Sequence, residues 1–395
     1  MRVAIFTDSW LPRIDGLTTS VQAAKTRLEA RGHSFHVFAP GPRRETVGDV
    51  TRYKGIPFWG YPDFHIALQP GQHDTPRLLR EGGFDAVHIE SPFLVGYFGL
   101  RAARKVGLPV VTSYHTYVPD LVPYVVPPGF RAVSRRLAWR FTGAFFNRSD
   151  IVLVPSPSCA RELVRHVPGH KIANLEVHPN GVDIARFHPG AARPAMRRRL
   201  GPPGSRILLS VGRLAREKDI PFLVEAFATA HKSDPALHLA IGGKGPDLPR
   251  VKQRITDTGV AGHVTLLGFI PDADLPAAYA SADAFASASQ FETQGMTAVE
   301  AMACGTPVAA VKARGLGDFV LDGQTGHLFE AGDVAQAAAA IREAIGAGPA
   351  MRQAARAHAE TLGLEKSVDQ LEAVYRRVVA TGPTRLQPRA VTASA

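Results

Sequence analysis

The sequence predicts an α/β fold of two doubly wound, Rossmann-like domains that face a central cleft. The chain has 395 residues, which is more than one typical hydrophobic core accommodates. Short apolar runs alternate with helical patterns along it, as in parallel sheets covered by helices on both faces. This alternation starts again after a stretch rich in Arg, Pro, Ala and Gly near the middle of the chain.

The first half opens with a strand, a loop, a helix and a strand. Residues 2–7 form a short apolar run typical of a buried parallel strand. Helical spacing follows over 18–31, and Gly32 is expected to end that helix before a second strand at 33–39. The same reasoning predicts a helix at 95–105 and strands at 86–89, 109–114, 150–155 and 175–179.

The second half repeats the pattern. It predicts strands at 206–212, 238–242, 264–268, 284–287 and 307–311, and helices at 221–232, 297–303, 334–346 and 350–362. We place the domain junction in the turn and coil-like stretch before these elements, which extends to residue 204. The N-terminal domain is assigned to 1–185 and the C-terminal domain to 186–365. A final helix at about 366–380 is expected to pack back on the N-terminal domain, and 381–395 to form a loose tail.

Composition limits the possible classes of protein. A hydrophobic content of 45% and a charged content of 21% are ordinary for a soluble globular protein. The two cysteines, Cys159 and Cys304, lack metal-site or redox spacing, which favours a reducing, cytoplasmic compartment. We expect neither a signal peptide nor a transmembrane span. The net charge of +11 favours anionic partners, and the absence of a nucleic-acid-binding motif makes lipid or phosphorylated substrates better candidates than nucleic acid.

The most informative stretch contains two carboxylates, Glu292 and Glu300, separated by seven residues. Glu292 lies beside Gly295 in an expected loop, and Glu300 lies in a short helix that Gly305 and Pro307 terminate. Backbone amides around 294–297 then form a helix N-terminus, which favours an anion. A phosphate flanked by two hydroxyl-binding carboxylates describes a nucleotide-sugar pocket, although two surface glutamates would give the same spacing.

Other candidates follow the predicted strands, because open α/β sheets bind ligands at the carboxyl ends of their strands. Gly16 would allow a phosphate to approach the backbone, and His115 could bond a substrate oxygen. Arg213 and Lys218 could neutralise a diphosphate. The glycine-rich turn at 242–246 fits neither a P-loop nor a dinucleotide-binding fingerprint, but would allow close approach of a nucleotide. Each feature alone could be a plain turn, a structural histidine or a solvated charge.

Together these residues resemble the retaining GT-B glycosyltransferases of glycosyltransferase family 4. The resemblance covers nearly the whole chain, and it implies transfer of a hexose from a nucleotide diphosphate sugar with retained configuration and no required metal or cofactor. It rests on this ordered set: Asp15-Gly16, His115, Arg213 with Lys218, Gly242-Gly-Lys-Gly-Pro246, Gly268-Phe-Ile-Pro271 and Glu292-x7-Glu300. Many members have Gly-Gly where this chain has Asp15-Gly16, which leaves the acceptor side open.

The resemblance implies a role for each matching position. Catalysis would involve His115 near the reacting carbon, Arg213 and Lys218 on the diphosphate, and Glu292 on the sugar hydroxyls. Glu300 would bind the ribose, and Asp15 and Tyr117 would lie on the acceptor side. The other donor-binding positions are Gly16, Gly243, Gly245, Ile270, Gln294, Gly295, Met296 and Thr297.

The acceptor is expected to be a membrane glycolipid such as diacylglycerol. Residues 114–124 and the Thr-Gln-Gly of Glu292-Thr-Gln-Gly295 are similar to members that glycosylate such lipids. Basic and aromatic residues alternate over 130–148, which suits a helix lying on an anionic membrane surface. This would place the protein at the inner face of the membrane, unless the stretch is a core helix with solvated arginines. The expected contacts are Arg131, Arg135, Arg136, Trp139 and Arg140.

Several alternatives stay open at this stage. The acceptor could be phosphatidylinositol, a polyprenyl-linked glycan or a soluble sugar, and the donor UDP-glucose or GDP-mannose. A nucleotide-sugar epimerase or a non-catalytic sugar-nucleotide-binding protein would share the architecture. Acceptor-independent turnover would reveal the epimerase, and absence of turnover would favour the binding protein. The sequence does not indicate an oligomeric state.

Overall fold

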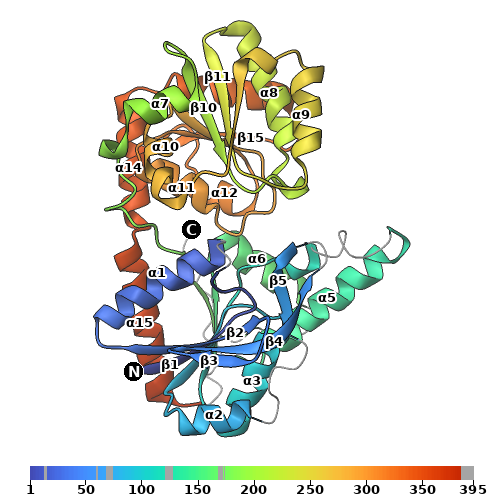
Figure 1. Cartoon of the computed structure of the whole chain (residues 1–395), viewed down its shortest axis with the longest axis vertical. Coiled ribbons are helices and arrows are strands. Elements are labelled where there is room, and N and C mark those ends of the chain that lie inside the picture. The colour runs from blue at the N-terminus through green and yellow to red at the C-terminus, as the bar shows by residue number, and fades with distance from the viewer. Residues whose placement is uncertain are drawn as a thin grey trace. The chain divides into compact units, whose positions relative to one another are not determined.

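A computed structural model describes residues 1–12, 16–58, 61–67, 74–120, 128–167, 172 and 174–383 (Figure 1). The chain forms two compact units. The first unit comprises Met1–Pro179 with Ser367–Ala395, and the second comprises Asn180–Lys366. The division therefore falls a few residues before the predicted boundary between 185 and 186.

The first unit is built on a mainly parallel sheet with the strand order β3-β4-β2-β1-β6-β7-β8-β9. The antiparallel strands β3 and β5, which the sequence pattern does not predict, pair with β4 at one edge. The bounds are β1 Arg2–Phe6, α1 Gly16–Ala30, β2 Ser34–Gly41, β3 Glu45–Val47, β4 Val50–Phe58, β5 Tyr61–Ala67, α2 Thr75–Glu81, β6 Ala86–Ile89, α3 Leu94–Val106, β7 Val110–Ser113, α5 Arg131–Phe146, β8 Ile151–Val154, α6 Pro157–His166 and β9 Leu175–Val177.

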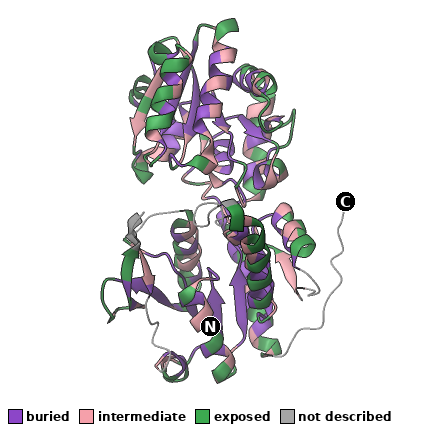
Figure 2. Ribbon diagram, turned by 90° about the vertical axis from the view of Figure 1, so that its right-hand side faces the viewer, coloured by how far each residue is buried: buried purple, intermediate pink, exposed green. Residues whose placement is uncertain are grey.

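Packing of the first unit explains why these apolar runs form central strands. In Figure 2 the central strands are buried, and Val3 and Val37 are both 0% exposed. The rings of Phe6 and Phe38 stack across β1 and β2 with centroids 4.5 Å apart. A Cβ at Gly99 of α3 would lie 2.5 Å from the ring of Phe6, so only glycine lets this helix pack so closely on the sheet.

The second unit contains a six-stranded sheet in the order β12-β11-β10-β13-β14-β15, with parallel pairing throughout. Its bounds are α7 Pro194–Leu200, β10 Arg206–Val211, α8 Ile220–Ser233, β11 Leu237–Gly242, α9 Leu248–Asp257, β12 Val264–Gly268, α10 Leu275–Ala280, β13 Ala284–Ser287, α11 Met296–Ala303, β14 Val308–Val311, α12 Arg314–Phe319, β15 Gly326–Phe329, α13 Val334–Ile345 and α14 Pro349–Thr361. Strand order places β10 and β13 side by side, so their carboxyl ends meet at one edge.

The stretch that the sequence suggests as the junction is instead part of the second unit. It contains α7, whose Met196 and Leu200 are 7% and 0% exposed and belong to the core of that unit. Proline at the start of a helix is tolerated because its missing amide would have no partner there, and residues four apart share one helix face. A composition typical of coil therefore conceals a short amphipathic helix.

The last helix, α15 (Leu364–Thr381), begins in the second unit and continues into the first. Arg31 pairs with Asp369 at 2.6 Å and with Glu372 at 3.1 Å, which ties α15 to the turn after α1. Tyr375 is 1% exposed. The part of α15 from Ser367 onward is therefore an integral part of the first unit.

Candidate active site

Two cations lie beyond the carboxyl end of β10. Arg213 follows the strand, and Lys218 closes a short 3-10 turn, Arg216–Lys218, that leads into α8. The Nη2 of Arg213 lies 2.5 Å from Oε1 of Glu217, and the ammonium of Lys218 forms an ion pair with the carboxylate of Glu292. The side chains of Arg213 and Lys218 are 47% and 26% exposed, so an anionic ligand can reach both.

Glu292 lies in the loop between β13 and α11. Gly295 has a φ of 85°, and its carbonyl accepts hydrogen bonds from the amides of Ala298 at 2.9 Å and Val299 at 3.2 Å. The amides of Met296 and Thr297 precede these donors in the open first turn of the helix. Unsatisfied amides and the helix dipole both favour an anion at such a position.

Helix α12 holds this loop in place. The amide of Gly315 donates to the carbonyl of Glu292 at 3.1 Å, and a Cβ on Gly315 would lie 2.6 Å from the backbone nitrogen of Gln294. The Gln294 side chain is 1% exposed and bonds the backbone of Asn180 in both directions, at 2.7 and 2.9 Å. Among the predicted donor-binding residues, Gln294 therefore anchors the loop through its side chain and can offer a ligand only its backbone.

Glu300 projects from α11, the helix that follows the Glu292 loop. The hydroxyl of Tyr279 donates to its Oε2 at 2.9 Å. Burial raises the pKa of Glu300 to about 7, an effect that the Tyr279 hydrogen bond and the charge of Arg186 reduce and the charge of Asp272 increases. A carboxyl oriented in this way can accept hydrogen bonds from two vicinal hydroxyls, as on a ribose, while it is ionised.

The glycine-rich turn after β11 packs against the loop after β10. A Cβ at Gly243 would lie 1.8 Å from the carbonyl oxygen of Gly212, and one at Gly245 would lie 2.1 Å from that of Leu214. Close contact between two backbones thus requires both glycines, whether or not a nucleotide binds. Ile270 is 5% exposed and packs over Gly242, so its side chain belongs to the core and only its backbone could flank a base.

In the first unit, His115 follows the carboxyl end of β7. Its Nε2 lies 2.9 Å from Oε2 of Glu90, a residue that directly follows β6. Gly16 is the first residue of α1, and a Cβ there would meet nothing within 4 Å. Asp15, the predicted acceptor-side residue, lies outside the described residues.

Family models match both halves of the chain. Residues 14–186 match "Glycosyltransferase Family 4", and residues 192–362 match "Glycosyl transferases group 1". The chain is 30% identical to the alpha-monoglucosyldiacylglycerol synthase of Streptococcus pneumoniae, over 89% of this chain and 80% of that protein. The chain belongs to glycosyltransferase family 4.

Further comparisons agree with this assignment. The enzyme is 37% identical to the GDP-mannose-dependent alpha-mannosyltransferase of Mycolicibacterium smegmatis, over 84% of each chain. A sucrose-phosphate synthase from Thermosynechococcus elongatus has the same architecture, with a TM-score of 0.76 and 23% identity over 96% of this chain and 99% of that chain. The expected GT-B fold with two Rossmann-like domains is thereby confirmed.

One predicted acceptor-side residue of the glycosyltransferase is buried. Tyr117 is 4% exposed, and its hydroxyl lies 2.9 Å from the Sγ of Cys159. Its ring also meets that of Tyr114 edge to face, with centroids 5.6 Å apart. Tyr117 therefore packs in the core of the first unit and does not present its hydroxyl to an acceptor.

Helix α5 places only some of the predicted membrane contacts on the surface. Trp139 is 7% exposed and stacks on His166 with centroids 4.8 Å apart, so it is a core residue and not a membrane contact. Arg135, Arg136 and Arg140 are exposed, and Arg131 is half-buried. The exposed apolar residues of this region follow helical spacing: Phe130 (68%), Val133 (62%), Leu137 (59%) and Phe141 (42%).

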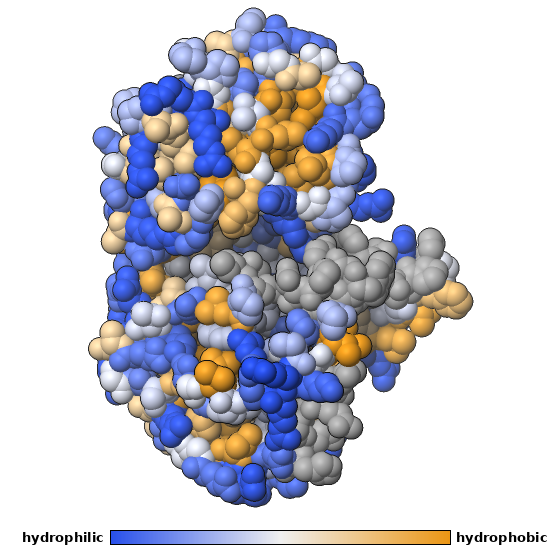
Figure 3. Space-filling view, in the orientation of Figure 1, coloured by the Kyte–Doolittle hydropathy of each residue, from blue (hydrophilic) through white to orange (hydrophobic). Residues whose placement is uncertain are grey.

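This face of α5 combines apolar and basic side chains. Figure 3 shows hydrophobic and hydrophilic residues together at the right-hand edge of the molecule, where α5 lies in Figure 1. None of the described helices is both long and apolar enough to cross a bilayer. The amphipathic character of α5 thus comes from a surface stripe, and Trp139 anchors the opposite side of the helix to the core.

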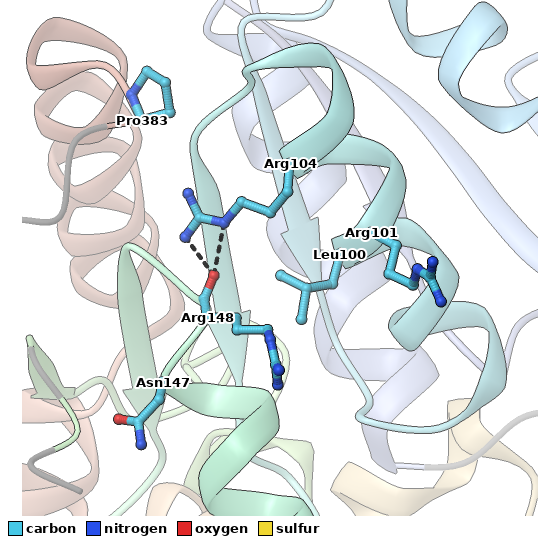
Figure 4. A pocket seen from close by; sticks show the side chains of 6 residues that line it. All are labelled: Leu100, Arg101, Arg104, Asn147, Arg148 and Pro383. Atoms are coloured by element: carbon cyan, nitrogen blue, oxygen red, sulfur yellow. Dashed lines mark hydrogen bonds between the residues drawn. The ribbon is translucent and has the colours of Figure 1, made fainter.

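The first unit contains a hollow between α3 and the residues that follow α5 (Figure 4). Its volume is about 520 Å³, and its lining includes Arg101, Arg104 and Arg148. The Arg104 guanidinium donates to the Arg148 carbonyl and pairs with Asp150 at 3.1 Å. These residues lie near the amino ends of β7 and β8, whereas His115 follows a carboxyl end, so this hollow is not the candidate active site.

Sequence reasoning missed several residues that contact the predicted site residues within each unit. Glu90 follows a predicted strand directly, so the rule that identified His115 could also have identified it. Glu217 and Tyr279, the partners of Arg213 and Glu300, carry no comparable signal, because their roles depend on contacts within the fold. Among the described residues, no group of three or more His, Cys, Asp or Glu side chains could hold a metal ion. Metal independence stays a prediction.

Proposed function

We propose that this enzyme is a retaining, metal-independent hexosyltransferase that moves a sugar from UDP-glucose or GDP-mannose to a hydroxyl of a membrane glycolipid such as diacylglycerol. The observation that carries the proposal is the Lys218–Glu292 ion pair beside the N-terminus of α11. It brings a phosphate-binding cation and a hydroxyl-binding carboxylate to one loop. The name of the second relative supports GDP-mannose as the donor, and the name of the first supports a transferred glucose and a diacylglycerol acceptor.

Arg213 and Lys218 would hold the diphosphate. As the bond between sugar and diphosphate breaks, negative charge grows on the leaving group, and cations already in place stabilise it more than they stabilise the bound donor. The first-turn amides of α11 would contribute further donors to the same oxygens. Each cation is paired with a glutamate in the structure. The phosphates of the donor would therefore replace these glutamates as partners of Arg213 and Lys218.

Glu292 would accept hydrogen bonds from hydroxyls of the transferred hexose, and Glu300 from the ribose. Both carboxylates belong to the same loop and helix, so one rigid element would recognise both sugars of the donor. His115 would contact the hexose near its reacting carbon, and Gly16 would allow the diphosphate to approach the first unit. Retention of configuration is part of the proposal because the family resemblance implies it.

The lipid acceptor is supported by the surface of α5. Apolar side chains at 130, 133, 137 and 141 can enter the boundary between headgroups and acyl chains, and Arg136 and Arg140 can meet anionic phosphates. Each basic residue near an anionic surface contributes about 1 kcal/mol of attraction. The enzyme would thus work at the inner face of the membrane, where its acceptor lies.

The test is nucleotide release and sugar transfer with a panel of UDP- and GDP-sugars. Each donor is incubated with anionic vesicles that contain or lack diacylglycerol, and in parallel with soluble sugars and phosphatidylinositol, with and without a metal chelator. We expect one nucleotide to be released only when diacylglycerol is present. The transferred sugar should have the same anomeric configuration in the product as in the donor. Glu292→Ala serves as the inactive control.

Each other outcome contradicts a defined part of the proposal. Transfer only to soluble sugars or phosphatidylinositol would replace the acceptor. Loss of transfer in the chelator would contradict metal independence, and an inverted product would contradict retention. Conversion of the donor without any acceptor would favour an epimerase, and absence of release with every donor would favour a binding protein.

A further inference from the structure

A chain of buried polar groups lies beneath His115 in the first unit. Glu90 is 4% exposed, and its Oε2 lies 2.9 Å from Nε2 of His115. The other oxygen of Glu90, Oε1, lies 3.4 Å from Nδ1 of His88. Burial by itself would raise the pKa of Glu90, but the charge of His88 and the hydrogen bonds from His115 and Ser113 lower it to about 2. The carboxyl is therefore ionised at neutral pH.

His88 closes the inner end of this chain. Its Nδ1 lies 2.6 Å from the hydroxyl of Tyr375 and its Nε2 lies 2.8 Å from that of Ser113. The ring is 2% exposed, and burial lowers its pKa, an effect that the charge of Glu90 opposes. The buried Glu90 is thus enclosed by strands β6 and β7 and helix α15, and the ring of His178 is also near enough to interact with it electrostatically.

The protonation of Glu90 determines which nitrogen of His115 carries hydrogen. An ionised carboxylate can only accept hydrogen bonds, so Nε2 of His115 must be the donor of the 2.9 Å contact. In a neutral imidazole the remaining nitrogen, Nδ1, is then an acceptor. A hydroxyl can donate to such a nitrogen, whereas an unprotonated phosphate oxygen cannot.

We propose that Glu90 is a positioning residue for sugar transfer, which holds the His115 ring with hydrogen on Nε2 and presents Nδ1 as an acceptor to a hydroxyl of the donor hexose. The inference rests on the proposed function, since it assigns a ligand group to His115 within that reaction. A hydrogen-bond partner of one ring nitrogen commonly determines the tautomer and orientation of a histidine that uses its other nitrogen. At metal sites, loss of such a partner typically costs about 10–100-fold in activity or affinity. Comparable losses are expected here.

The experiment combines imidazole NMR with kinetics. Protein labelled with ¹⁵N-histidine gives the tautomer of His115 without substrate, and His115→Gln identifies its signals. In the wild-type enzyme we expect hydrogen on Nε2. Glu90→Ala should lose this preference and lower kcat by about 10–100-fold, while the affinity for UDP or GDP alone stays within about twofold, because Glu90 holds no phosphate. Glu90→Gln retains an acceptor oxygen without the charge, so it should recover much of the tautomer preference and of kcat.

Tyr375→Phe is the matched control. It removes the other end of the chain and leaves the Glu90–His115 contact, so thermal stability should fall while the His115 tautomer is retained. Hydrogen on Nδ1 in the wild-type protein would overturn the inference, as would wild-type kcat in Glu90→Ala. Equal effects of Tyr375→Phe and Glu90→Ala on the tautomer would overturn it too. By contrast, Nε2 hydrogen in a protein that transfers no sugar would support the tautomer and contradict the proposed function.

Discussion

Lys218 and Glu292 form an ion pair although they are 74 positions apart in the chain. Lys218 follows β10 and Glu292 follows β13, and these strands are parallel neighbours in the sheet of the second unit. In the proposed reaction the cation binds the diphosphate and the carboxylate binds the hexose. The pair therefore keeps both groups in place before the donor arrives, at the cost of a contact that the donor must replace.

Replacing the cation tests its part in diphosphate binding. Lys218→Ala should weaken the binding of UDP or GDP by about 10–100-fold, because one charge-assisted hydrogen bond contributes about 1.5–3 kcal/mol. Isothermal titration calorimetry measures this change. Lys232→Ala, which removes an equal charge from the exposed end of α8, is the control. Unchanged affinity for both nucleotides in Lys218→Ala would count against the assignment.

Replacing the carboxylate should separate catalysis from nucleotide binding. Glu292→Gln should lower transfer by about 100–1,000-fold, which is the loss that follows removal of one preorganised hydrogen-bonding group at a reacting centre. The affinity for UDP or GDP alone should stay the same or rise, because Lys218 loses its competing partner. Initial rates, calorimetry and circular dichroism together measure this. Near-normal turnover would refute the role of Glu292.

Glu300 predicts a pH-dependent stability. The folded state binds its proton more tightly than the unfolded state does, since the pKa is raised from 4.5 to about 7. The folded state therefore loses stability as pH rises from about 4.5 through 7. At pH 8 this costs at most about 3 kcal/mol, and partial exposure of the side chain lowers the cost.

Glu300→Gln removes that cost and can still accept the Tyr279 hydrogen bond. Its apparent Tm should exceed that of the wild-type enzyme by about 2–6 °C at pH 8, with little difference at pH 5. Nucleotide binding should weaken, because the ribose loses a charged acceptor. Calorimetric scans at the two pH values measure the effect, and an equal Tm difference at both would show that the ionisation of Glu300 is not its cause.

Substitution by alanine should destabilise the fold at Gly243 but not at Gly16. Gly243→Ala would place a Cβ 1.8 Å from the carbonyl oxygen of Gly212, so we expect destabilisation of about 3 kcal/mol or more. A Cβ at Gly16 meets nothing within 4 Å, so Gly16→Ala should fold normally and lose transfer only if the donor approaches there. Thermal unfolding and initial rates distinguish the two, and a stable Gly243→Ala protein would contradict the packing argument.

The exposed arginines of α5 predict binding to anionic vesicles. Replacing Arg135, Arg136 and Arg140 with Ser should weaken this binding by about 100-fold, because each basic residue contributes about 1 kcal/mol of attraction to the anionic surface. Vesicle sedimentation measures it. The control replaces three exposed cations elsewhere on the first unit, Lys105, Arg161 and Arg165. If the control weakens binding as much, net charge alone explains the attraction; if neither does, α5 is not the membrane face.

The sequence predicts the two-unit architecture and most central strands and helices, because these depend on local periodicity. It is less informative at 190–204, where a coil-like composition contains α7, and over 40–85, where β3, β4, β5 and α2 carry weak patterns. It also overestimates the accessibility of Tyr117 and Trp139. An aromatic side chain suits a core and a binding surface equally well, so its type does not show which it occupies.

The sequence by itself determined the family, the strand ends that carry polar residues, and the spacing of Glu292 and Glu300. Each of these depends only on local motifs and on the order in which they follow one another along the chain. Only the tertiary structure decided the partners: Lys218 with Glu292, Gln294 with the backbone of Asn180, and Glu90 with His115. Such pairs join residues far apart in sequence. Which strands lie side by side is decided when the whole chain buries its apolar surface, so no local pattern contains that information.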